Sequence, residues 1–126
     1  MSEAKGQIRS HRDLLAWQKA MDLAIEVYQI TKDFPREELY GLTSQIRRAA
    51  SSIPANIAEG QGRRLTGEFQ HFLGNARGSL LELDTHLELS FRLAYLSAVR
   101  YSHVQEMIQE VGRILNGLIR SLKPNC

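Results

Sequence analysis

Four arginines stand in two pairs on either side of a glycine-containing segment, and they are the residues best suited to bind an anion. Arg47 and Arg48 precede residues 60–62, and Arg63 and Arg64 follow them directly. Guanidinium groups and the backbone N–H groups at a helix start both bind phosphate oxygens well. The two pairs therefore indicate a phosphate-contact surface for RNA or DNA.

An alternative interpretation of these arginines is structural. They can be solvated, or they can form ion pairs with Glu59, Glu68 and other acidic residues, including acidic residues across a subunit boundary. The formal net charge is +2, from 16 Lys and Arg against 14 Asp and Glu, and it does not by itself indicate a nucleic-acid partner. A ring-shaped oligomer would repeat each arginine pair around its axis, so that a weak patch binds by multivalency.

Two histidine-containing groups have residue types that occur in metal or acid–base sites. Glu68 and His71 have the Glu-x-x-His spacing of di-iron bundles, but that centre needs a second such step and two more inward carboxylates. The sequence has no second Glu-x-x-His. His86 lies between Asp84 and Glu88, and we expect it to be a solvated histidine on a helix surface of mixed charge.

The motifs of common enzyme classes are absent from the sequence. It has no P-loop, nucleophile elbow, Cys-x-x-Cys or strand-associated Gly-x-Gly-x-x-Gly. We therefore expect a protein without enzymatic activity, cofactor or metal. The single cysteine, Cys126, can close no intrachain disulfide. No apolar run reaches the ~18 residues that span a bilayer, and no signal peptide is recognisable, so we expect a cytoplasmic protein with no membrane partner.

The elements that must position these residues are helices. Apolar residues recur at three- and four-residue steps in four long stretches. The expected helices cover residues 13–34, a stretch from 37–43 to 60–62, residues 67–95, and a stretch from 98 or 102 to 122. We therefore predict an all-α, antiparallel up-down-up-down four-helix bundle. It forms a single domain over residues 1–126, with residues 1–12 as a flexible tail.

Capping signals mark several of the expected helix ends. Ser10 with Asp13 and Ser102 with Gln105 are candidate capping boxes, and Thr66 is a candidate N-cap. These residues place the starts of the first, fourth and third helices.

Pro54 interrupts the second helix. Because proline removes a backbone donor and crowds the preceding turn, we expect a bend near Ser51 and Ser52. We interpret Pro54 and Asn56 as structural rather than as a polar binding site. Gly78 in the third helix is expected to be a close-packing point for another helix.

The first and fourth helices carry the apolar residues that bear on assembly. The first shows one stripe of Leu14, Trp17, Met21, Ala24, Ile25 and Tyr28, in which Trp17 and Tyr28 are core or interface residues. The fourth has a stripe wider than one bundle core requires. We interpret the surplus as a subunit interface formed by Met107, Val111, Ile114 and Leu118, and we expect a homo-oligomer.

An ordered set of short segments resembles a known family. The main one reads LYGLTSQIRRAA over residues 39–50 and SIPANIAEG over 52–60, with DL and WQKA in the first helix and RGSL and EL in the third. They resemble the four-helix-bundle family first encountered as reading frames within intervening sequences of bacterial large-subunit ribosomal RNA. The resemblance covers nearly the whole chain.

The resemblance implies a bundle that assembles into a ring, commonly a homopentamer, with no established enzymatic activity and a suspected role in binding nucleic acid. Distant relatives include the accessory variability protein of diversity-generating retroelements, a basic pentameric barrel that resembles a partner for reverse transcriptase and nucleic acid. The alternative is a purely structural scaffold that contacts another protein and no nucleic acid.

Overall fold

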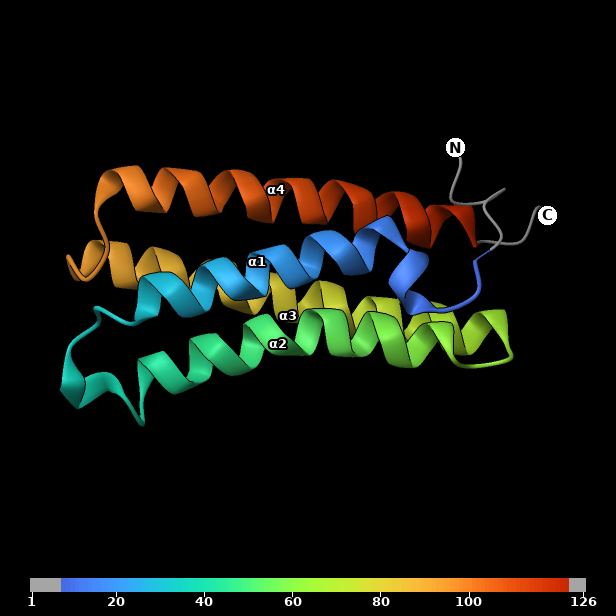
Figure 1. Cartoon of the computed structure of the whole chain (residues 1–126), viewed down its shortest axis with the longest axis horizontal. Helices are drawn as coiled ribbons and strands as arrows, with labels where there is room; N and C mark the ends of the chain where they lie inside the picture. The colour runs from blue at the N-terminus through green and yellow to red at the C-terminus, as the bar shows by residue number, and fades with distance from the viewer. Residues whose placement is uncertain (1–7, 123–126) are drawn as a thin grey trace.

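Four long helices pack side by side along one axis in the computed structural model, which describes residues 8–122 (Figure 1). The elements are η1 (His11–Asp13), α1 (Leu15–Thr31), η2 (Arg36–Glu38), α2 (Leu42–Gln61), α3 (Thr66–Arg92) and α4 (Ala98–Ser121). Successive long helices run in opposite directions, and α1 and α3 each pack against both α2 and α4. The predicted all-α four-helix architecture is confirmed, and residues 8–122 contain no strand.

The core is aliphatic and draws on all four helices. Its fully buried large side chains are Leu23, Val27 and Ile30 of α1, Ile46, Ile53 and Ile57 of α2, Leu73, Leu83 and Leu87 of α3, and Val104, Val111 and Leu115 of α4. Burial of each such side chain contributes about 1.5–3 kcal/mol. The predicted stripes of α2, α3 and α4 supply most of this core.

Helix α1 carries two apolar stripes, and the predicted one is largely the outer one. The core stripe is Ala16, Ala20, Leu23, Val27 and Ile30. In the predicted stripe, Leu14 and Ala24 are buried, whereas Met21, Ile25 and Tyr28 are 36%, 55% and 41% exposed. Both stripes have helical spacing and are rotated relative to each other around the helix, so periodicity alone could not tell which faces the core.

The capping box of Ser10 and Asp13 is present, but it caps η1 rather than α1. Leu14 is extended, and α1 begins at Leu15. Because Ile8 packs against the core, the predicted flexible tail does not extend over residues 8–12. Residues 1–7 and Cys126 lie outside the described residues.

The predicted N-cap of α3 is wrong by one position, and the predicted N-cap of α4 is wrong by five positions. Leu65 is the N-cap of α3, without a side-chain hydrogen bond, and Thr66 is the first helical residue. Helix α4 begins at Ala98, where the Ser97 hydroxyl accepts a hydrogen bond from the Arg100 backbone N–H. Ser102 lies inside the helix.

Helix α2 runs unbroken through Pro54. The Ser52 hydroxyl lies 2.9 Å from the Ala49 carbonyl oxygen and 2.6 Å from Ser79 Oγ of α3, and Asn56 Nδ2 donates to the Ser52 carbonyl at 2.8 Å. These polar groups bond to the helix and to its neighbour, which agrees with the structural interpretation of this segment.

Gly60, rather than Gly78, is the close-packing glycine. A Cβ atom at Gly60 would lie 2.8 Å from Phe72 Cβ and 3.3 Å from the Phe69 carbonyl oxygen, so α2 and α3 approach closely here. A Cβ atom at Gly78 would meet nothing within 4 Å. The expectation that another helix of the chain packs on Gly78 is therefore wrong. No helix within residues 8–122 is long and apolar enough to cross a membrane.

Candidate nucleic-acid interface

The four predicted arginines do not form one patch on the chain. Arg47 and Arg48 lie near the start of α2, and Arg63 and Arg64 follow its end. Sixteen residues separate Arg47 from Arg63, which corresponds to about 24 Å along a helix. The two pairs therefore belong to opposite ends of the bundle.

Arg47 is committed to the packing of α2 on α1. Its Nε donates to Thr31 Oγ1 at 2.8 Å, and a terminal nitrogen donates to the Tyr28 carbonyl at 3.3 Å. Its Cζ lies 4.8 Å from the centroid of the Tyr28 ring. The side chain thus satisfies a carbonyl in the last turn of α1. Arg48 is exposed, and its guanidinium group has no polar partner within residues 8–122, although its carbonyl accepts a hydrogen bond from Ser51 Oγ.

At the other end, Arg63 is partly engaged and Arg64 is not. A terminal nitrogen of Arg63 lies 2.7 Å from Glu59 Oε2, and its Cζ lies 4.7 Å from the Phe72 ring centroid. The Arg63 side chain still keeps 42% of its surface exposed. Arg64 is exposed, with no polar partner in the described part of the chain.

The backbone donors after Gly60 close helix α2 and do not point at a ligand. The Gly62 N–H donates to the Ala58 carbonyl at 3.2 Å, and the Arg63 N–H donates to the Gly60 carbonyl at 3.0 Å. The N–H groups of Gly62 and Arg63 are therefore not available to a phosphate, and the role of the N–H groups at the start of α3 stays a prediction.

Further arginines gather at the end that carries Arg63 and Arg64. Ile8, Gln61 and Ser121 line one pocket of about 700 Å³, so the start of the described chain, the end of α2 and the end of α4 lie together. Residues 8–13, 59–68 and 117–122 contribute Arg9, Arg12, Arg63, Arg64 and Arg120 against Asp13, Glu59 and Glu68. We name this set of eight residues the basic end.

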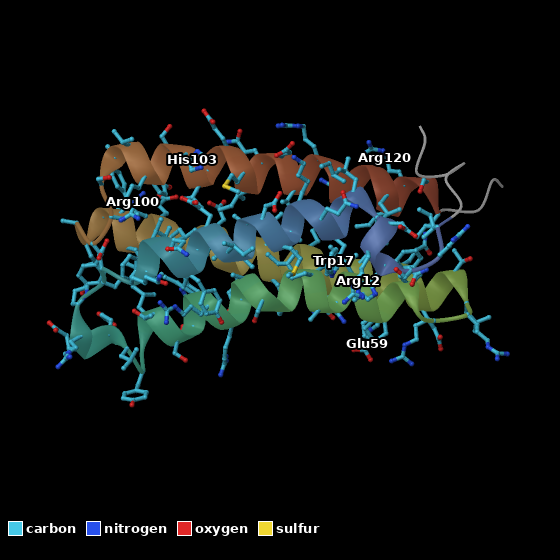
Figure 2. All side chains as sticks on the ribbon, viewed as in Figure 1. Arg12, Trp17, Glu59, Arg100, His103 and Arg120 are labelled. Carbon is cyan, nitrogen blue, oxygen red and sulfur yellow. The ribbon has the colours of Figure 1, made fainter. Side chains whose placement is uncertain are left out.

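The opposite end of the bundle is electrically balanced. Residues 32–41 and 88–100 carry four basic and four acidic side chains: Lys32, Arg36, Arg92 and Arg100 against Asp33, Glu37, Glu38 and Glu88. Figure 2 shows Arg12 and Arg120 in the half of the bundle near η1, and Arg100 in the other half. The connecting segments of this balanced end thus carry no net charge, but Arg47 and Arg48 of α2, beside Tyr28, lie outside that count.

One hydrogen-bonded carboxylate group lies at each end of the bundle, Asp13 at the basic end and Glu38 at the balanced end. The backbone N–H groups of Arg9 and Ser10 donate to Asp13, which lowers the pKa of the Asp13 carboxyl group. At the balanced end, the Tyr95 hydroxyl donates to Glu38 Oε2 at 2.9 Å, and this hydrogen bond raises the pKa of Tyr95. Asp13 thus holds η1, which carries Arg12, in place.

The candidate interface residues of α4 are mostly covered by the bundle itself. Val111 is 1% exposed and belongs to the core, so its side chain is not available to a neighbouring subunit. Met107, Ile114 and Leu118 are partly buried against that core. For these three residues, an interface role stays a prediction.

A further apolar surface lies between α1 and α2, and it includes Trp17 and Tyr28, which the sequence predicted to be core or interface residues. This α1–α2 groove has a volume of about 560 Å³. Its lining consists of Trp17, Met21, Ala24, Ile25, Tyr28 and Gln29 from α1 with Ser51, Pro54, Ala55 and Ala58 from α2. The signal for this groove in the sequence is the second apolar stripe of α1. From the sequence alone, the apolar residues of that helix are interpreted as one stripe.

The histidine groups do not form a metal site. Glu68 and His71 are exposed on α3, and the His71 ring packs against Phe72 with centroids 5.6 Å apart. Within residues 8–122, no group of three or more His, Cys, Asp or Glu could hold an ion. His86 is not solvated as predicted: its side chain is 20% exposed, and Nε2 lies 3.5 Å from Glu82 Oε2.

Residues 12–117 match the profile of a family described as 23S rRNA-intervening sequence protein. A crystal structure of a protein of unknown function from the S23 ribosomal protein family of Bacteroides thetaiotaomicron is similar, with a TM-score of 0.78 and 24% sequence identity. The similarity covers 84% of this chain and 96% of that chain, and at this identity it shows the fold alone. A comparison with curated proteins returns no match.

Proposed function

Because the chain belongs to the 23S rRNA-intervening sequence protein family, we propose that it is a non-enzymatic homo-oligomeric module that binds RNA or DNA through its basic end. The assembly is a ring of subunits, and a homopentamer is what the family resemblance implies. The module acts in the cytoplasm and needs no cofactor or metal.

The observation that carries this proposal is the gathering of arginines at one end of the bundle. Arg9 and Arg12 precede α1, Arg63 and Arg64 join α2 to α3, and Arg120 closes α4. Arg64 is exposed without a polar partner in the described chain, and Arg63 is two-fifths exposed. Arginine side chains in this state are suited to contact phosphate oxygens.

Assembly into a ring would place the positively charged basic ends of several subunits close together. Subunits related by a cyclic axis parallel to their helices would present all their basic ends on one rim. A nucleic acid that spans several subunits would then bind by multivalency. Its affinity would depend steeply on salt, because each neutralised phosphate releases counterions.

The second candidate function is a scaffold for another protein. It is favoured by the exposed α1–α2 groove and by the engagement of Arg47 and Arg63 within the chain. In this account the arginines stabilise the fold, and no nucleic acid binds.

Two double variants separate the candidates. Arg63→Ala with Arg64→Ala removes two charges from the basic end, and Arg92→Ala with Arg100→Ala removes two from the balanced end. Binding to a structured RNA and to duplex DNA is measured by fluorescence anisotropy, and the oligomeric mass by light scattering. We expect the first variant to lose about tenfold or more in affinity at unchanged mass, and the second to bind within about twofold of wild type.

Equal losses in both variants would contradict a localised site, because they would reflect net charge alone. Dissociation of the oligomer in the first variant would place Arg63 and Arg64 in a subunit interface. No binding by the wild-type protein at low salt would leave the protein scaffold as the better account.

A further inference from the structure

The α1–α2 groove is an apolar surface that is already shaped for a partner. Ile25 at its centre is 55% exposed, and Tyr28 is 41% exposed. Arg12 stacks on Trp17 at one end, with Cζ 5.8 Å from the ring centroid, and Arg47 stacks on Tyr28 at the other. These contacts hold the two aromatic side chains in place, so little order has to be gained on binding.

A second exposed apolar surface lies on the outer face of α3. Gly78, Leu81, Thr85 and Leu89 follow one another at three- and four-residue steps, and Leu81 and Leu89 are 59% and 46% exposed. Because a Cβ at Gly78 would meet nothing within 4 Å, this face has room for a bulky side chain from outside the chain.

The two surfaces also lie at the same height along the bundle, as contacts with α4 show. Lys19 Nζ of α1 lies 3.7 Å from Glu110 Oε2, while Leu80 of α3 packs beside Gly112, two residues further on. Since α3 and α4 are antiparallel, Lys19 is level with about residue 82 of α3.

A second pair of contacts gives an alignment that agrees with the first to within three residues, about 4.5 Å along a helix. Glu26 of α1 lies 3.9 Å from His103, and Asp84 of α3 accepts a hydrogen bond from Gln105 at 2.6 Å. Glu26 is therefore level with about residue 86 of α3. The stripe from Trp17 to Tyr28 consequently lies at the height of Gly78–Leu89, and both helices run in the same direction (Figure 1).

From this geometry we propose that the α1–α2 groove of each subunit receives the outer face of α3 from a second copy of this chain. The proposal rests on the homo-oligomer proposed above and names its interface. Helices α1 and α3 are diagonal in the bundle, whereas the groove opens between α1 and α2, so the two faces lie on different sides of the subunit and the contact is head to tail. Because the two faces lie at similar heights, neighbouring subunits need little shift along the axis. Such a contact forms a ring when the rotation between neighbouring subunits closes.

Charge supports this pairing at one end of the groove. Arg48 is exposed, its guanidinium group has no polar partner in the described chain, and its neighbour Arg47 contacts Tyr28. Glu88 adjoins Leu89 on α3, at the height of Tyr28; its carboxylate forms an ion pair with Arg92 and is 48% exposed, so it can accept a further contact. The docked arrangement brings Arg48 of one subunit near Glu88 of the next.

The test uses two variants, each of which destroys one face. Ile25→Arg places a charge in the groove, and Gly78→Arg fills the outer face of α3. Both positions are exposed, so circular dichroism should show a folded helical protein in each case. Met21→Arg and Thr85→Arg serve as second variants of the same faces, and Gln109→Arg on exposed α4 surface is the matched control.

Light scattering should give a monomer for each face variant alone and the wild-type mass for Gln109→Arg. An equimolar mixture of Ile25→Arg and Gly78→Arg should form a dimer and nothing larger, because the mixture retains one intact pair of faces. A mixture that stays monomeric, or a Gly78→Arg variant that keeps the wild-type mass, would overturn the pairing. A monomeric wild-type protein would instead refute the proposed homo-oligomer itself.

Discussion

The guanidinium of Arg47 lies over the aromatic ring of Tyr28, with Cζ 4.8 Å from the ring centroid. This contact joins α2 to the last turn of α1 and holds Tyr28, which lines the α1–α2 groove. The guanidinium group of Arg48, the next residue, has no polar partner in the described chain. Two adjacent arginines with the same chemistry therefore have different roles, because successive helical residues point about 100° apart.

The two arginines are expected to differ in their effect on stability. Arg47→Ala removes a charged hydrogen bond to Thr31 and a cation–π contact, and should lower the free energy of unfolding by about 1–2 kcal/mol. Arg48→Ala should change it by less than about 0.5 kcal/mol. Urea denaturation followed by circular dichroism measures both values. Equal effects of the two substitutions would refute the structural role of Arg47.

Because α2 approaches α3 closely at Gly60, an added methyl group at this position should destabilise the folded protein. Gly60→Ala would place Cβ 2.8 Å from Phe72 Cβ, and overpacking of this kind destabilises by about 1–3 kcal/mol. Gly112→Ala is the matched control, since its Cβ would lie at an ordinary 3.5 Å from Leu80 Cδ2. The control should be neutral or stabilising by up to about 1 kcal/mol. Thermal unfolding of both variants checks the sign of each change, and a stabilised Gly60→Ala would contradict the packing.

The hydrogen bonds to Asp13 predict a pH-dependent contribution to stability. The pKa of Asp13 is lowered in the folded state by the backbone N–H groups of Arg9 and Ser10. The contribution is therefore present above the unfolded pKa of about 3.9 and is lost as the pH falls through the folded pKa. The difference in melting temperature between wild type and Asp13→Asn should be largest near neutral pH and shrink below about pH 4. A difference that is constant across this range would show that ionised Asp13 does not hold η1.

The helical architecture could be predicted from the sequence because three of the four helices have one dominant apolar stripe. Leu83 and Leu87 of α3 and Val104 and Leu115 of α4 repeat every three or four residues and are all buried. In α1 two stripes compete, and only tertiary packing decides that Leu23 rather than Ile25 faces the core. In α4, Val111 of the predicted interface is buried in its own bundle, whereas the interface role of Met107, Ile114 and Leu118 stays a prediction.

The candidate site could be predicted only in part. Arg63 and Arg64 stand out as a pair in the sequence, but Arg9, Arg12 and Arg120 are distant from them along the chain. They join the basic end because an antiparallel bundle brings the start of α1, the end of α2, the start of α3 and the end of α4 together. The pairing of Arg47 with Thr31 depends on side-chain direction, which spacing does not specify.

The most direct test of nucleic-acid binding by the basic end is the salt dependence of affinity for duplex DNA, measured for wild type and for Arg63→Ala with Arg64→Ala. The plot of log association constant against log salt concentration should fall linearly. Its slope should become shallower in the double variant by about 2 for each subunit that contacts the DNA, since each phosphate contact contributes about 0.9. The same slope in both proteins, or binding that does not change with salt, would contradict the proposed function.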